Sequence, residues 1–259
     1  MTSCVSCQAV FTGTVPPACP SCGAPLGRGA TSLRRGASIL APSGAPTFTP
    51  APRMKLPVQV TLGIEIDRTG SSDAFRRGIA TSSEVLLEAI GAKAKGLTVY
   101  VGTHGDLDYG EAPVLHTSAG TPEQALADIR AITYAGGGDA PEHHLDGILH
   151  FLQTVPWPMD SRTARGALVS FLTDESKPSQ SGMSATEIGE AIRAKQLLFY
   201  AVCQPTPTLQ ELVRAANGME IAISDAPDRA ELQRAAALVA ASIVATVGAG
   251  GTVPMKTVA

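Results

Sequence analysis

Two groups of residues in this chain have types and spacing suited to binding metal ions. The first comprises four of the five cysteines, which form a C-x2-C-x11-C-x2-C pattern at Cys4, Cys7, Cys19 and Cys22. Two such pairs of thiolates, each on a tight turn, can close a tetrahedral Zn²⁺ site. The segment is too short to fold on a hydrophobic core, so a metal would supply most of its stability. We therefore predict a small structural zinc module over residues 1–25.

The second group consists of hard oxygen ligands. In the sequence Asp67-x-Thr69-x-Ser71, alternate residues of an extended loop point to one side, so one carboxylate and two hydroxyls can converge on one ion. Mg²⁺ prefers six oxygens and keeps several waters, and Ca²⁺ takes six to eight oxygens. Three further acidic residues can supply oxygens from distant loops: Asp139 and Glu142 in a glycine-rich turn, and Asp174 after an apolar run. This group predicts a Mg²⁺ or Ca²⁺ site.

These residues must be positioned by alternating strands and helices. Apolar and polar patterning predicts strands at 58–66, 96–101, 166–173, 197–203 and 219–223, and helices at 74–94, 122–133, 141–154, 185–194, 208–216 and 228–245. Such an order predicts an α/β domain over residues 57–247, with a doubly wound, mostly parallel sheet covered by helices on both faces. Ligands of such sheets bind at the carboxyl ends of the strands. The candidate oxygen ligands all fall at that edge.

The remaining segments and the composition limit the possible functions. Residues 26–56 read as a Pro-, Gly- and Ser-rich linker, and residues 248–259 as a flexible tail. Residues 1–55 are basic and contain no Asp or Glu, but the net charge of −3 gives no electrostatic case for nucleic acid. No secretory signal is visible, and the longest uncharged apolar run is shorter than the roughly 20 residues that span a bilayer. We expect a cytoplasmic protein without a membrane span.

The D-x-[ST]-x-S loop after a buried strand, the Gly-Gly-Gly-Asp-x-Pro-Glu turn and the later Thr-Asp together resemble the von Willebrand factor A (vWA) family over residues 57–245. The likeness is to intracellular bacterial members, and the Asp-x-Pro-Glu turn is similar to that of integrin β subunits. The four-cysteine module resembles the zinc ribbons of bacterial regulatory proteins. The resemblance implies a metal-ion-dependent adhesion site at Asp67, Thr69 and Ser71, completed by Glu142 or Asp139 and by Asp174. Many members place a Thr in the glycine-rich loop, so the carboxylates here predict a more acidic site, which either favours Ca²⁺ or reduces the attraction of the ion for an incoming carboxylate.

Several neighbouring residues are candidates for the rim of this site. Gly70 and Ser72 are uncharged and would let a partner approach closely, and we expect His143 nearest the ion. His104 either lines the ligand surface or sits in a polar turn. His143, His144, Asp146 and His150 cluster after Glu142, and positions 143, 146 and 150 share a helix face, which suggests a second metal site or a hydrolytic centre. No H-E-x-x-H spacing is present, and we favour histidines at the surface or rim.

These features favour a binding or scaffold protein over an enzyme. The bound ion would accept an Asp or Glu carboxylate from a protein partner, and the zinc ribbon with its basic linker would give a second contact. The resemblance suggests AAA+ ATPases, or kinase and phosphatase partners in stress or conflict systems. The alternative is a metal-dependent hydrolase that uses the Asp/Glu/His edge. A nucleic-acid module at the amino terminus has little support, because Phe11 and Phe48 are its only aromatic residues.

Overall fold

The computed structural model describes residues 2–3, 10–11, 58–159 and 163–247. The chain divides into two compact units, Met1–Ala51 and Pro52–Ala259. In the first unit, β1 (Thr2–Ser3) and β2 (Val10–Phe11) pair in an antiparallel ladder. The four cysteines of the predicted zinc ribbon, the predicted linker and the predicted tail lie outside the described residues. The zinc ribbon therefore stays a prediction.

The second unit is built on a six-stranded sheet with the order β5-β4-β3-β6-β7-β8. Its strands are β3 (Gln59–Asp67), β4 (Gly96–His104), β5 (Val114–Gly120), β6 (Ala164–Phe171), β7 (Leu198–Cys203) and β8 (Met219–Ala222). All neighbouring strands are parallel except β4 and β5, which are antiparallel. The predicted α/β fold with a mostly parallel sheet is thus confirmed, with one antiparallel strand added at the edge.

The strand β5 is absent from the sequence prediction. Its residues are largely exposed or half-buried, and only Thr117 is buried. An edge strand that is largely exposed to solvent has few apolar side chains. It therefore lacks the alternation of apolar and polar residues by which strands are predicted from a sequence. A second difference concerns the helix predicted from 141, which begins at His144. The residues before it form an irregular turn that includes a cis Ala140–Pro141 peptide bond.

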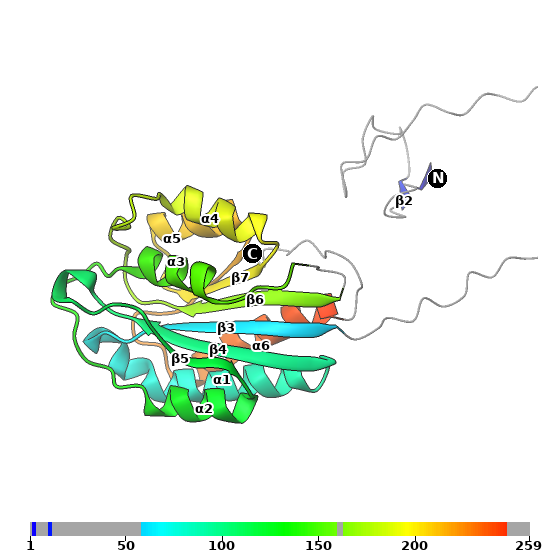
Figure 1. Cartoon of the computed structure of the whole chain (residues 1–259), viewed down its shortest axis with the longest axis horizontal. Helices are drawn as coiled ribbons and strands as arrows, with labels where there is room; N and C mark the ends of the chain where they lie inside the picture. Colours follow the sequence, from blue (N-terminus) through cyan, green and yellow to red (C-terminus); the bar gives the residue numbers. More distant parts are fainter. Residues whose placement is uncertain (1, 4–9, 12–57, 160–162, 248–259) are drawn as a thin grey trace, which may run out of the picture. The chain divides into compact units, whose positions relative to one another are not determined.

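In the described part of the chain, helices cover both faces of the sheet (Figure 1). One layer contains α1 (Arg76–Gly91), α2 (Pro122–Ala131) and α6 (Arg229–Val247), and the other contains α3 (His144–Thr154), α4 (Ala185–Ala194) and α5 (Pro207–Ala216). Each layer buries its own apolar cluster against the sheet. Because both faces are covered, the central strand β3 is buried along almost its whole length. Among the described helices, α6 alone is long and apolar enough to cross a membrane, and here it packs against α1 and the core.

The order of the strands decides where polar side chains from distant segments meet. From β3 the chain passes to β4 on one side, whereas β6 lies on the other side of β3. The carboxyl ends of β3 and β6 therefore flank the point at which the strand order reverses, where ligands bind in sheets of this kind. Asp67 is the last residue of β3, and Thr173 follows two residues after β6.

Candidate metal centre

The loop after β3 gathers one carboxylate and two hydroxyls. Asp67 is 1% exposed, and its Oδ1 accepts hydrogen bonds from the backbone N–H of Thr69 (2.9 Å) and from Thr69 Oγ1 (2.8 Å). The Oγ atoms of Thr69 and Ser71 are 3.0 Å apart. Ser71 and Gly70 are exposed, so this cluster of oxygens opens to solvent on one side. A buried carboxylate beside the buried hydroxyl of Thr69 and the exposed hydroxyl of Ser71 is a donor set that suits a hard divalent cation.

The glycine-rich turn packs directly against this loop. The backbone N–H of Gly70 donates to the carbonyl of Gly136 (3.0 Å), and both Gly136 (φ +91°) and Gly137 (φ +66°) adopt left-handed backbone conformations that favour glycine. A Cβ on Gly137 would lie 2.8 Å from Glu142 Oε1 and 3.1 Å from Thr69 Cβ. The close approach of this turn therefore brings the Glu142 carboxylate beside the Asp67 loop.

The environment of Glu142 leaves its carboxylate short of partners. The residue is 4% exposed, and its Oε2 has no hydrogen-bond partner among the described residues. Burial raises the pKa of Glu142 to about 7, helped by the negative charges of Asp67 and Asp106 and opposed by His104 and Lys177. An unsatisfied buried carboxylate oxygen beside other oxygen ligands is what a cation would neutralise. The residues present thus fit a divalent ion.

Asp139, the other acidic residue of the turn, has a different partner. Its side chain is 58% exposed and accepts a hydrogen bond from Lys177 Nζ at 2.8 Å. The same ammonium lies 2.8 Å from Asp106 Oδ2 and 2.8 Å from Asp108 Oδ2. Burial raises the pKa of Asp106, but hydrogen bonds from Lys177 and from the backbone of Asp108 outweigh it and hold that pKa below its usual value. Lys177 therefore joins three carboxylates from two loops, whereas Glu142 is the acid beside the Asp67 loop.

A buried polar network lies behind Asp67. Thr173 donates a hydrogen bond from Oγ1 to Asp67 Oδ2, and the Thr173 carbonyl lies 3.1 Å from His144 Nε2. His144 Nδ1 lies 2.7 Å from His104 Nε2, and His104 Nδ1 contacts Glu65 Oε1. All of these residues are buried, with at most 4% of their surface exposed to solvent. Asp67, His104 and His144 each offer a ligand atom within 4.8 Å of the other two, so they could hold a metal ion.

Hydrogen bonding in this network indicates its protonation. The Thr173 carbonyl can only accept, so His144 Nε2 carries a proton and its Nδ1 accepts from His104. Burial and the neighbouring His104 together lower the pKa of His144 to about 4, although Asp67 and Glu65 oppose them. Burial also lowers the pKa of His104, but Glu65 beside it reverses the effect, and the pKa of His104 is raised. The pKa of Asp67, which burial raises, is held below its usual value by His144 and His104 and by its hydrogen bonds.

Three residues predicted for the rim of the site are buried in the structure. His104 (1% exposed) and His143 (3%) lie inside the protein, and Ser72 (1%) is buried as well. His144, which was expected at the surface or rim, is also fully buried. The histidines are buried because acidic or polar groups meet them there: Glu65 contacts His104, and Asp106 Oδ1 lies 2.9 Å from His143 Nδ1.

The sequence held one signal for this network. Glu65 interrupts a largely apolar strand. In a sheet that helices cover on both faces, a charged side chain is buried and requires a charged or hydrogen-bonding partner. Glu65 and Asp67 also point to the same face, because side chains alternate along a strand. Asp174, the remaining predicted ligand, is half-buried directly after Thr173.

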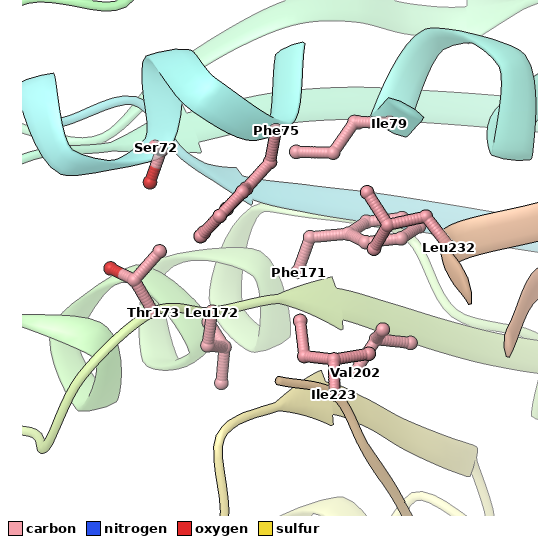
Figure 2. A pocket seen from close by; sticks show the side chains of 9 residues that line it. All are labelled: Ser72, Phe75, Ile79, Phe171, Leu172, Thr173, Val202, Ile223 and Leu232. Atoms are coloured by element: carbon pink, nitrogen blue, oxygen red, sulfur yellow. The ribbon is translucent and has the colours of Figure 1, made fainter. Parts of the chain in front are cut away.

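A small apolar cavity lies next to the loop that follows β3 and carries Thr69 and Ser71 (Figure 2). Its volume is about 10 Å³, and it is lined by Ser72, Phe75, Ile79, Phe171, Leu172, Thr173, Val202, Ile223 and Leu232. Figure 2 shows Phe75, from the 3-10 helix η1 (Gly70–Phe75), pointing into the space between β6 and α1. This space is too small for an organic ligand, so its lining residues act as packing that supports the loop from below.

Together these observations define an α/β domain with the fold of a vWA domain and a group of buried ligands at the carboxyl edge of its sheet. A solved structure with this fold is the vWA domain of SpRpn10, with a TM-score of 0.55 and 13% sequence identity over 69% of this chain and 93% of that chain. At this identity the likeness is one of fold alone. No family model and no curated protein matches the sequence.

Proposed function

We propose that this chain is a metal-dependent protein-binding protein. Asp67, Thr69 and Ser71 would hold a divalent ion, and Glu142 and Asp174 would supply the remaining protein oxygens. When bound, such an ion supplies an open coordination position that attracts a carboxylate. The observation that carries the proposal is the clustering of the Asp67, Thr69 and Ser71 oxygens at an edge that is open to solvent.

The acidic residues of the glycine-rich turn would have separate roles. Glu142 would serve the ion, because it flanks Thr69 and has an unpartnered buried oxygen. Asp139 would instead stay with Lys177, to which it is hydrogen-bonded. With Asp67 and Glu142 both ionised, two carboxylates would face one divalent ion, a charge balance that suits Mg²⁺ or Ca²⁺.

The partner would present an Asp or Glu side chain to the ion. Exposed Gly70, with no side chain, leaves room for this approach. The predicted zinc ribbon and basic linker would give a second contact to the same assembly, which raises the effective concentration of the first. We place this function in the cytoplasm and expect partners such as an AAA+ ATPase or a kinase and phosphatase system.

The proposal is tested by measuring Mg²⁺ or Ca²⁺ affinity calorimetrically and by capturing partners with the immobilised full-length chain, with and without EDTA. We expect Ser71→Ala to weaken ion binding and to abolish the EDTA-sensitive capture. Asp73→Ala is the matched control, because Asp73 lies in the same loop but its side chain is 59% exposed and pairs with Arg76. Capture that survives both EDTA and Ser71→Ala would contradict the proposal. Metal-dependent turnover of a phosphoester or peptide would favour the hydrolase alternative.

A further inference from the structure

The two buried imidazoles behind Asp67 have an arrangement typical of metal ligands. In metal sites, a ligating histidine usually donates its other ring N–H to a carboxylate or a backbone carbonyl, which fixes the ring and its tautomer. Both partners are present here: His104 Nδ1 contacts the Glu65 carboxylate, and His144 Nε2 lies 3.1 Å from the Thr173 carbonyl. As a result, His104 Nε2 and His144 Nδ1 point at each other, 2.7 Å apart.

The charges around these rings also call for a cation. Glu65 (0% exposed) and Asp67 (1% exposed) are two buried carboxylates on one strand, and Glu65 Oε2 has no hydrogen-bond partner among the described residues. A single proton shared by the two rings neutralises one of these carboxylates. A divalent ion bound by two neutral imidazoles would neutralise both, which removes the cost of an uncompensated buried charge.

We infer that Asp67, His104 and His144 form a buried site for a divalent ion of intermediate hardness such as Zn²⁺. Glu65 and the Thr173 carbonyl would hold the two imidazole rings in place. Two imidazoles and one carboxylate are a common ligand set for such ions, whereas Mg²⁺ takes oxygen ligands. The ion would replace the proton between the rings, which leaves to solvent.

For the two imidazoles, the fit requires only a small movement. Zn–N bonds of about 2.0–2.1 Å at a tetrahedral angle place two nitrogens about 3.3 Å apart, so the rings would separate by about 0.6 Å. The nearest constraint is Gly147 on α3, where a Cβ would lie 2.6 Å from His104 Cγ and 2.7 Å from Glu65 Oε1. The absence of a side chain at Gly147 is therefore what lets α3 lie against the pair formed by His104 and Glu65.

This site differs from the surface ion of the proposed function, although the two share Asp67. The surface ion would use Thr69 and Ser71, and the buried ion would use the histidines. The inference therefore does not rest on the proposed function, and different variants test each of them.

The experiment measures Zn²⁺ binding to the full-length chain in a Cys4→Ser, Cys7→Ser background, so that the predicted zinc ribbon does not contribute. We expect one Zn²⁺ per chain. His144→Ala should weaken this binding by at least about 100-fold, and Glu65→Gln by about 10- to 100-fold, the range found when a group that orients a ligand is removed. His150→Ala is the matched control, because His150 lies on the same helix outside the cluster.

Two further measurements keep the outcome clear. Ser71→Ala should leave Zn²⁺ binding unchanged while it weakens Mg²⁺ binding, so failure of either site can be recognised separately. X-ray absorption of the zinc-loaded chain, in the same cysteine background, should show two imidazole ligands, and this measurement does not depend on whether the His144 variant folds. A chain that binds no Zn²⁺ in this background, a spectrum without imidazole ligands, or unchanged affinity in a folded His144→Ala variant would overturn the inference.

Discussion

The pKa of Glu142 makes a quantitative prediction about ion binding at the surface site. In the ion-free protein this pKa is raised to about 7 by burial and by Asp67 and Asp106. An ion needs the ionised carboxylate, so protons compete with it. With a pKa of about 7, the ionised fraction of Glu142 is about 0.09 at pH 6 and about 0.91 at pH 8. The apparent Mg²⁺ or Ca²⁺ affinity should therefore rise about 10-fold between these pH values.

A rise in pH strengthens ion binding but weakens the folding stability of the ion-free protein. The folded, ion-free protein holds the Glu142 proton more tightly than the unfolded chain, whose Glu has a pKa near 4.5. The stability of the ion-free protein should therefore fall as the pH rises from about 4.5 through about 7. A saturating ion binds the ionised form and should reduce this loss.

Calorimetric titrations in buffers of different ionisation enthalpy measure both affinity and proton release. We expect about 0.9 proton released per ion at pH 6 and about 0.1 at pH 8. Glu142→Gln should bind more weakly and lose most of the pH dependence, whereas Asp139→Asn should keep it, because Asp139 is bonded to Lys177. An affinity that is equal at pH 6 and pH 8, or a Glu142→Gln variant with the same pH dependence as the parent, would refute the reasoning.

Three further predictions concern packing and charge, and thermal and denaturant unfolding test each. Gly147→Ala should lower stability by about 1–3 kcal/mol, because its Cβ meets a buried imidazole at 2.6 Å; the control Gly91→Ala, whose Cβ meets its nearest atom at 3.9 Å, should be neutral or gain up to about 1 kcal/mol. Thr173→Val should cost about 1–3 kcal/mol by leaving Asp67 Oδ2 without this donor, and an unchanged stability would contradict that role. Lys177→Met should lower the Tm by several degrees, since three carboxylates lose their shared ammonium, and a gain in Tm would disprove it.

The fold was largely predictable because the pattern that defines it is local. The buried central strand, the amphipathic helices and the helix starts at Pro122 and Ala185 depend on residues close in the chain. The edge strand Val114–Gly120 was missed because most of its residues are exposed, so its position depends on pairing with β4 rather than on its own apolar pattern.

The candidate site was predictable only in part. The spacing of Asp67, Thr69 and Ser71 within one loop places their oxygens together, because alternate residues of an extended chain share a side. The sequence could not show which acid of the turn lies beside the Asp67 loop, since Asp139 and Glu142 lie three residues apart in one irregular turn. Lys177, from a distant loop, binds Asp139, and the bend of the turn places Glu142 beside Thr69.

The sequence by itself determined the alternation of strands and helices, and with it the edge at which the polar residues of the carboxyl ends meet. Only the tertiary structure decided which histidines are buried and what they contact. His104 and His144 lie 40 residues apart in the chain, and they meet because β4 pairs with β3 while α3 crosses at Gly147. Contacts between separate elements depend on the packing of the whole domain, so no local pattern of polar residues can show that an imidazole pair lies behind Asp67.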